Sequence, residues 1–263
     1  MKTFNYHSTK DVKEASKLAS SNSAFLAGGM TTLPSMKLGL ATYKDIIDIK
    51  KIKKLSGIKI SKKTVIIGAT TKHAEVANSK EIKKAIPSLS ALAEGIGDPQ
   101  VRNRGTIGGS IANNDPAADY PSACIALNAV IHTNNRKIDA EKFFRGMFET
   151  SLKSGEIIES IEFAIPQKSS YQKYPNPASR YAIVGVFVSE GSDGCRVAVT
   201  GAGQNGVFRV DEMESALTSN LSADAVASIV ISDDDLNSDI HASAEYRAHL
   251  VTVMAKRAVT KAG

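Results

Sequence analysis

The hydrophobic positions of the first 55 residues change their period along the chain. Short, densely apolar segments at Phe4–Tyr6 and Ile46–Ile49 are typical of strands. Between them, apolar residues recur every three or four positions after Asp11, which predicts a helix that ends near Ser20. A third apolar run, Ala24–Leu26, precedes a second predicted helix from Thr32 to Leu38. The pattern therefore indicates a small unit that contains both strands and helices.

The next hundred residues have the same mixed character. Thr64–Gly68 predicts a strong strand, and residues 70–93 have a helical pattern in which Pro87 restarts the helix at Ser88. A helix is predicted from Tyr120 to Leu127, with Pro121 tolerated in its first turn. Two further segments complete the unit: a hairpin formed by residues 129–132 and 136–138, and a strand over residues 157–165.

A change of pattern near residue 166 predicts a domain boundary. The proline-bearing stretch Pro166–Pro177 is typical of a linker. Beyond it, Tyr181–Glu190 and Gly194–Thr200 predict antiparallel strands, and helices are predicted over about 221–230 and 239–258. We therefore expect an α+β protein with a first domain at 1–167, divided into subdomains at about 1–55 and 56–167, and a second domain of antiparallel sheet plus helices at 168–263.

Composition narrows the class of protein. The chain has 263 residues with 42% hydrophobic content, and no apolar run reaches the length of a signal peptide or a membrane span. We expect a cytoplasmic protein. Its cysteines, Cys124 and Cys195, are not in metal-ligand spacing, so we expect buried thiols and no metal or iron–sulfur site. The net charge is +6, and lysines gather between residues 50 and 63, where they alternate with Ile52, Leu55, Ile58 and Ile60. This pattern is typical of the solvated face of a helix and a strand, and it does not favour nucleic-acid binding.

The candidate chemistry lies in two glycine-containing segments. The first glycine bend is Ala27–Leu33 (AGGMTTL), and the second is Gly105–Ser110 (GTIGGS), which continues into ANNDPAADYP. Glycine removes the Cβ atoms that would keep an anion away from backbone amides. Either bend alone is also typical of a tight turn over a small core. Together, if the fold brings them close, they suit a diphosphate, with Asp115 as a turn residue before Pro116.

A rival motif occurs in the second domain. Residues 201–206 (GAGQNG) satisfy the dinucleotide pattern G-x-G-x-x-G and follow a predicted strand. The pattern should open a helix, whereas residues 207–210 continue as strand. We therefore expect a hairpin turn here and no nicotinamide site.

The segments AGGMTTLPSMKLGLA (27–41) and IGDPQVRNRGTIGGSIANNDPAADYP (96–121) resemble the FAD-binding medium subunits of molybdenum hydroxylases, the family of aerobic carbon monoxide dehydrogenase and xanthine dehydrogenase. The resemblance extends from Phe4 to about Ala258. Two residues depart from the family pattern, since Gly39 replaces an arginine and Met30 replaces a polar residue. The resemblance implies a flavin-binding domain of the vanillyl-alcohol-oxidase (PCMH) type followed by a small C-terminal domain.

The resemblance also implies non-covalent FAD, with its diphosphate bound by the amides of Gly28–Thr32 and Thr106–Ser110. Asp119 matches a residue that contacts the flavin nucleotide, although it is equally suited to cap the helix that begins at Tyr120. Lys173 matches a family lysine near the flavin; alternatively, it is an exposed linker lysine. Tyr181 matches an aromatic residue that covers the flavin ring; alternatively, it packs on the face of a strand. The expected cofactor-binding residues are Ala27, Gly28, Gly29, Met30, Thr31, Thr32, Thr106, Ile107, Gly108, Gly109, Ser110, Asn113, Asp119, Lys173 and Tyr181.

In function, the resemblance implies an oxidoreductase subunit that has no catalytic residue of its own. Electrons would pass from a molybdenum cofactor in a large subunit, through two-iron two-sulfur clusters in a small subunit, to this FAD and then to quinone or NAD. A dimer of such heterotrimers is the expected assembly. The alternatives are a non-catalytic nucleotide-binding or scaffolding protein and a stand-alone flavoprotein oxidase.

Overall fold

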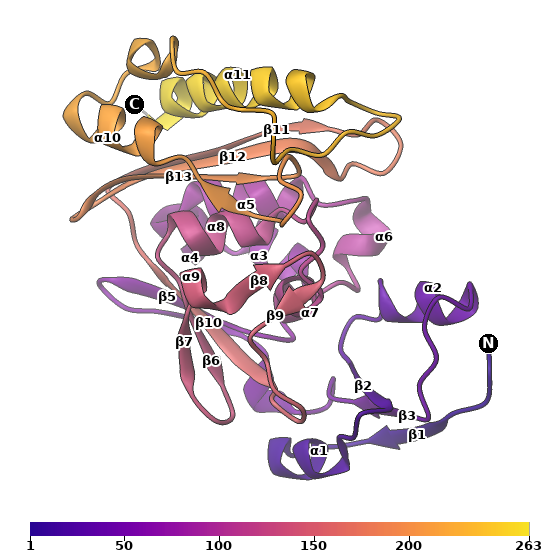
Figure 1. The fold of residues 1–263 in the computed structure, drawn as a ribbon. Helices are drawn as coiled ribbons and strands as arrows, with labels where there is room; N and C mark the ends of the chain where they lie inside the picture. The colour runs from indigo at the N-terminus through magenta and orange to yellow at the C-terminus, as the bar shows by residue number, and fades with distance from the viewer. Residues whose placement is uncertain (263) are drawn as a thin grey trace.

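The computed structural model describes residues 1–262 and consists of three layers (Figure 1). The N-terminal layer is a parallel sheet in the order β1-β3-β2, formed by β1 (Asn5–Ser8), β3 (Asp45–Asp48) and β2 (Ser23–Leu26). Its helices are α1 (Val12–Leu18) and α2 (Thr32–Lys37). Asp11 caps α1, because its Oδ1 accepts from the amides of Lys13 and Glu14 at 2.8 and 3.2 Å. The elements predicted for this part are confirmed.

The central layer is an antiparallel sheet in the order β4-β5-β10-β6-β7. Its strands are β4 (Ile58–Ile60), β5 (Thr64–Gly68), β10 (Ile158–Ala164), β6 (Val130–Thr133) and β7 (Lys137–Asp139). A short 3₁₀ helix, η1 (Lys53–Leu55), precedes the sheet, and the small hairpin of β8 (Phe144–Gly146) and β9 (Glu149–Thr150) lies beside it. The predicted strands at 64–68 and 157–165 and the predicted hairpin are confirmed.

The helical run after β5 is more divided than predicted. It forms α3 (His73–Asn78), α4 (Lys80–Ala85) and α5 (Pro87–Glu94). Ser79 ends one helix and caps the next, and Ile86 adopts φ −141° because it precedes Pro87. The remaining helices of this layer are α6 (Pro99–Arg102), α7 (Ile107–Asn113), α8 (Tyr120–Ala126) and α9 (Ala140–Phe143).

The C-terminal layer is an antiparallel sheet in the order β11-β12-β13-β14. Its strands are β11 (Lys168–Pro175), β12 (Ala182–Gly191), β13 (Gly194–Thr200) and β14 (Phe208–Arg209). The linker prediction was wrong, because residues 168–175 form the edge strand of this sheet. The sequence did not predict this strand because it contains polar residues such as Lys168 and Gln172, although Ser170 and Tyr171 are buried.

Helices cover both faces of this sheet, with α11 (Ala244–Ala262) on one side and α5 and α8 on the other (Figure 1). Helix α10 (Asp211–Ser219) and the 3₁₀ helix η2 (Ala223–Val226) complete the layer. Of the helix predicted over 221–230, the structure has only this 3₁₀ turn, so the prediction was wrong for the other residues. The last helix begins later than predicted because Asp239 forms a turn, in which its Oδ1 accepts from the amides of His241 and Ala242.

One hydrophobic core spans the predicted domain boundary. Tyr171 and Phe187 of the C-terminal sheet belong to the same buried cluster as Phe163 of the central sheet and Leu92 of α5. A second cluster fills the space between α11 and the outer face of the C-terminal sheet. Within residues 1–262, no helix combines the length and apolar character needed to span a membrane.

Candidate functional site

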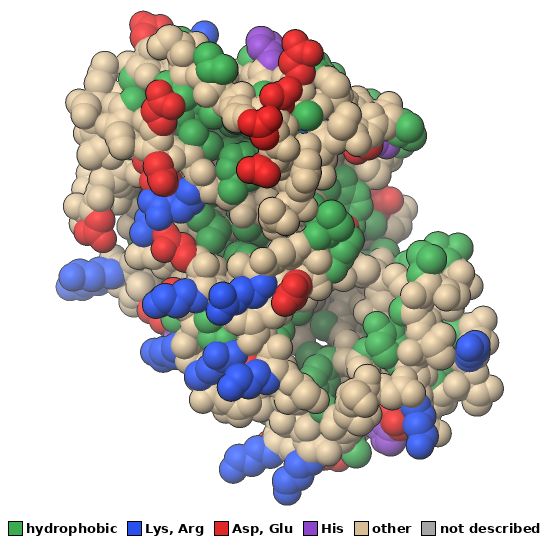
Figure 2. Space-filling model, in the orientation of Figure 1, with side chains coloured by type: hydrophobic (Ala, Val, Ile, Leu, Met, Phe, Trp, Pro, Cys, Tyr) green, Lys and Arg blue, Asp and Glu red, His purple; other side chains and the backbone are tan. Residues whose placement is uncertain are grey.

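The two glycine bends, far apart in the sequence, are in backbone contact. A Cβ atom on Gly28 would lie 2.2 Å from the carbonyl oxygen of Arg104 and 2.8 Å from the Cα of Gly105. No side chain fits there, so glycine is required for the approach. Both bends line one cavity of about 480 Å³, and Figure 2 shows the surface hollowed between the N-terminal layer and the rest of the molecule.

The first bend offers unused hydrogen-bond donors to this cavity. Gly29 has φ +77°, and the chain then turns into α2. Within the described residues, the backbone amides of Gly29–Thr32 donate to no acceptor, and the hydroxyls of Thr31 and Thr32 make no hydrogen bond. Consecutive free amides with adjacent hydroxyls form a binding site for an anion.

The second bend is built differently from what the sequence suggested. Its glycine pair is the first turn of α7, and the amides of Ile107 and Gly108 already donate to Thr71 O (3.1 Å) and Ala69 O (2.8 Å). The amide of Gly109 donates to Thr106 Oγ1 at 3.1 Å. The second bend therefore has few amides to offer a ligand. It contributes the hydroxyl of Ser110 and the close approach that Gly109 permits.

Most of the expected residues line the cavity, and three do not. The expected residues that line it are Ala27, Gly28, Gly29, Met30, Thr31, Thr32, Thr106, Gly109, Ser110, Asn113, Asp119 and Tyr181. Ile107 is fully buried, and a Cβ on Gly108 would lie 2.5 Å from that of Ala69, so both pack inward against β5 and its following turn. Residues that sequence reasoning did not assign to the site include Phe25, His73, Ile96, Gly97, Val101 and Arg180.

Lys173 lies behind the cavity wall and is part of a buried hydrogen-bonded group. Its Nζ lies 3.0 Å from Asp119 Oδ1 and donates to Gly95 O and Arg180 O, each at 2.9 Å. An ammonium group has three donors, and these contacts use them all. This geometry does not support the expected direct role of Lys173 beside a flavin; the side chain instead fixes the two loops that border the cavity.

Asp119 is held by a residue that the sequence did not reveal. Tyr171 donates its hydroxyl to Asp119 Oδ1 at 2.5 Å, and both side chains are buried. Asp119 makes no cap hydrogen bond to α8, so the capping interpretation was wrong. Burial raises the pKa of Asp119, and the neighbouring Lys173 and the Tyr171 hydroxyl oppose that shift. Asp115 is a turn residue as predicted, since its Oδ1 accepts from the amide of Ala117 at 2.9 Å.

His73 packs against the second bend at Gly105. Its backbone amide donates to Gly105 O at 3.0 Å, and a Cβ on Gly105 would lie 2.6 Å from its Nε2. Burial, with a smaller contribution from the charge of Arg102, lowers the pKa of His73 to about 4. The imidazole is therefore neutral near pH 7. Its Nδ1 has no partner within the described residues.

Tyr181 stands at the mouth of the cavity, with 45% of its surface exposed. The loop before it is fixed by Asn176, whose Oδ1 accepts from the amides of Ala178 and Ser179 at 2.9 and 3.1 Å. Arg180 has φ +63°, which turns the chain so that Tyr181 faces the cavity. The ring is thus an exposed aromatic wall on a rigid loop.

These features fit FAD. The free amides and hydroxyls of the first bend suit its diphosphate, and no carboxylate lies within that bend. The aromatic Tyr181 suits its planar ring. The rival glycine motif does not form such a site, because residues 201–206 connect the antiparallel strands β13 and β14 as a turn, as predicted.

Comparison with known proteins decides the family. Residues 2–167 match the family described as the FAD binding domain in molybdopterin dehydrogenase, and residues 169–262 match the carbon monoxide dehydrogenase flavoprotein C-terminal domain. The chain belongs to the FAD-binding medium subunits of the molybdenum hydroxylases.

Similar proteins are found across this family. The carbon monoxide dehydrogenase medium chain of Hydrogenophaga pseudoflava is 34% identical over 98% of this chain and 96% of its own length. The glyceraldehyde dehydrogenase medium chain of Sulfolobus acidocaldarius is 33% identical over 97% and 96%. Among solved structures, carbon monoxide dehydrogenase from H. pseudoflava lacking the Mo-pyranopterin moiety matches with a TM-score of 0.89, 33% identity and coverage of 99% of this chain and 97% of that chain.

The expected fold class, the flavin cofactor and the oxidoreductase class are thereby confirmed. The relatives are named as medium chains and FAD-binding subunits, so they are components of multi-subunit enzymes. Cys124 and Cys195 are buried free thiols, as expected. Among residues 1–262, no group of three or more His, Cys, Asp or Glu side chains is placed to hold a metal ion.

Proposed function

We propose that this medium subunit binds FAD non-covalently in the 480 Å³ cavity and transfers electrons between partner subunits and an external acceptor. When bound, FAD supplies the capacity to accept and release electrons. A small subunit with two-iron two-sulfur clusters would deliver them from a molybdenum cofactor in a large subunit, and quinone or NAD would receive them. A dimer of heterotrimers in the cytoplasm is part of the same proposal.

The observation that carries this proposal is the backbone contact between the two bends at Gly28 and Gly105. The diphosphate is bound by the amides of Gly29–Thr32 and by the hydroxyls of Thr31, Thr32 and Ser110, with Thr106 capping α7 beneath it. Gly109 leaves room for the phosphates, and Asn113, whose side chain makes no hydrogen bond within the described residues, faces the same cavity. Tyr181 covers the ring. Asp119 fixes the wall together with Lys173.

The domain division belongs to the proposal as well. A flavin-binding domain at 1–167, with subdomains at about 1–55 and 56–167, is followed by a C-terminal domain at 168–263. The separate matches to residues 2–167 and 169–262 support this boundary. The shared core of Tyr171 and Phe163 indicates that the two domains are nevertheless firmly packed.

Purification from the native source tests the function. We expect a yellow protein with flavin absorbance that elutes with an iron–sulfur subunit and a molybdenum subunit, and whose flavin absorbance bleaches when substrate is added to the assembled complex. A lone polypeptide that oxidises a substrate by itself would identify a stand-alone oxidase and contradict the proposal. A colourless protein that elutes with the same partners would identify a scaffolding role.

A further inference from the structure

His73 is a deeply buried polar side chain that lines the proposed flavin cavity. Only 5% of its surface is exposed. Within the described residues, neither nitrogen of its ring makes a hydrogen bond. Buried polar atoms normally have partners, so an imidazole without any indicates that a bound molecule supplies one.

The two ring nitrogens differ in what can reach them. Nδ1 has no accessible surface. The ring of Tyr120, whose buried hydroxyl also has no partner within the described residues, packs beside it with 5.4 Å between the ring centroids. Nε2 keeps accessible surface, and the proposed flavin cavity is the cavity that His73 lines. Nε2 is therefore the ring nitrogen that a ligand in this cavity can reach.

Gly105 leaves this nitrogen uncovered. A Cβ atom on residue 105 would lie 2.6 Å from Nε2 and 2.8 Å from Cδ2 of His73. Any other residue at this position would therefore cover Nε2 or push the ring aside. Gly105 is also the residue whose Cα Gly28 of the first bend approaches. Nε2 thus opens into the cavity beside the point where the two bends meet.

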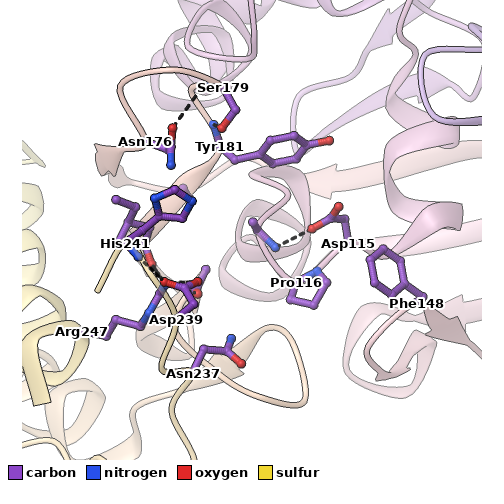
Figure 3. Close-up of a pocket in the computed structure, with 14 residues that line it drawn as sticks. Asp115, Pro116, Phe148, Asn176, Ser179, Tyr181, Asn237, Asp239, His241 and Arg247 are labelled. Carbon is purple, nitrogen blue, oxygen red and sulfur yellow. Dashed lines mark hydrogen bonds and ion pairs between the residues drawn. The ribbon is translucent and has the colours of Figure 1, made fainter. Parts of the chain in front are cut away.

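Neither carboxylate that lines the cavity is a partner for Nε2. Oδ1 of Asp119 accepts from the hydroxyl of Tyr171 and lies 3.0 Å from Lys173 Nζ. Asp115 also lines an adjoining cavity of about 400 Å³, and its Oδ1 accepts from the amide of Ala117 (Figure 3). Nε2 therefore stays free for a group that enters with the ligand.

The charge near His73 favours an anion as that group. Burial and the positive charge of Arg102 both lower the pKa of His73, so the ring is neutral near pH 7 and one nitrogen carries a proton. A proton on Nδ1 would be a buried donor that nothing reaches, so the favourable tautomer carries it on Nε2. Nε2 is then a hydrogen-bond donor that faces the cavity in the field of a cation.

We infer that His73 donates a hydrogen bond from Nε2 to an oxygen of the FAD diphosphate. The inference rests on the proposed function, which places the diphosphate between the two bends that meet at Gly105. It adds a side-chain donor to the backbone amides of Gly29–Thr32, and it accounts for a buried histidine that has no partner within the described residues. His73 is thus a cofactor-binding residue, and Gly105 gives the cofactor access to it.

Titration of the flavin-depleted protein, purified with its partners, tests the inference with two isosteric variants. His73→Gln places its amide nitrogen close to the position of Nε2 and can donate in its place, whereas His73→Asn places its amide nitrogen close to the position of Nδ1. We expect FAD to bind about tenfold or more weakly to His73→Asn, and within about threefold of the unmodified affinity to His73→Gln. ADP, which has the diphosphate but no flavin, should show the same difference. The control is the exposed His249→Asn, which leaves both affinities unchanged.

A second measurement needs no substitution. Hydrogen exchange at C2 of the His73 ring, followed by mass spectrometry across pH, reports the pKa of this residue in the unmodified protein. We expect ADP to raise this pKa above its value of about 4, because an anion at Nε2 stabilises the protonated ring. The other charged or titratable groups near the ring and in the cavity are the same with and without ADP; they are Arg102, Asp115, Asp119 and Tyr120.

Three results would each overturn the inference: equal FAD affinities of the two His73 variants, an ADP affinity that does not follow the FAD affinity, or a His73 pKa that ADP leaves unchanged. If His73→Asn does not fold, the pKa measurement decides alone. An unmodified protein that binds no FAD contradicts the proposed function, whereas these three results in a protein that binds FAD contradict only the role of His73.

Discussion

At the scale of single residues, the site depends on where backbone atoms are free and where they are already used. In the first bend, the amides from Gly29 to Thr32 donate no hydrogen bond. In the second bend, the amides of Ile107, Gly108 and Gly109 already donate to acceptors within the protein. Sequence alone located both bends because glycine pairs are visible in it. It could not reveal which amides were free, since that depends on Thr71 and Ala69, more than 30 positions away in the chain.

The role of Gly109 can be tested by adding a single methyl group. Its Cβ would lie 2.9 Å from Thr106 Oγ1 and would disturb the contact that caps α7 at the cavity. We expect Gly109→Ala to weaken FAD binding about tenfold or more, a loss of about 1.4 kcal/mol or greater, measured by titrating apoprotein with FAD and following flavin fluorescence. Gly191→Ala, on the β12–β13 hairpin with its nearest contact at 3.9 Å, is the control. Equal affinity in both variants would show that the phosphates lie elsewhere.

His73 makes stability depend on pH in a defined direction. Its folded pKa of about 4 lies below the unfolded value of 6.5, so the unfolded chain binds the proton more readily between these values. Stability is therefore lost as the pH falls from about 6.5 towards 4. We expect His73 to lower the free energy of unfolding by about 2 kcal/mol at pH 5 relative to pH 7, and His73→Gln to remove that loss, as measured by urea denaturation. The exposed His249→Gln should retain it; a His73→Gln profile that matches the unmodified protein would refute this account.

At the scale of elements, the edge strand β11 shows where pattern reasoning failed. The segment KSSYQKYP has polar residues and prolines nearby, which are typical of a linker. It forms a strand because β12 supplies its hydrogen-bond partners and α5 packs against it. The central strands β12 and β13 were predicted correctly because their apolar residues are continuous. Residues 168–175 therefore form a strand because they pair with β12, and their local composition alone does not predict it.

Lys173 joins β11 to the end of α5 and to the loop that carries Tyr181. It is 10% exposed and its partner Asp119 is 5% exposed, so removal of one charge leaves the other buried and unpaired. We expect Lys173→Met to destabilise the protein by about 3–5 kcal/mol, measured by chemical denaturation, with partial recovery in the Asp119→Asn, Lys173→Met double variant. The exposed Lys168→Met on the same strand is the control. Equal stability of the two lysine variants would exclude this role.

At the scale of the whole molecule, the hydrophobic core is continuous across the domain boundary that the sequence predicted near residue 167. Tyr171 and Phe187 of the C-terminal layer are buried with Leu92 and Phe163 of the central layer. The α+β class, the order of the predicted domains and most strands were evident from periodicity. Periodicity did not reveal that the two domains share one core, because it shows which face of an element is buried but not which element covers that face.

This shared core predicts cooperative unfolding. We expect the flavin-free chain to unfold in a single transition, with equal calorimetric and van't Hoff enthalpies in scanning calorimetry, because separation of the layers would expose the cluster around Tyr171 and Phe187. Two resolved transitions would instead show that residues 1–167 and 168–263 fold independently.

A crystal structure of the FAD-loaded chain would show where the diphosphate binds. We expect the diphosphate to lie between the two bends, with its oxygens within hydrogen-bond distance of the amides of Gly29–Thr32 and of the Ser110 hydroxyl, while Gly28 and Gly105 stay in contact. A diphosphate bound outside this cavity, or bends separated from each other, would contradict it.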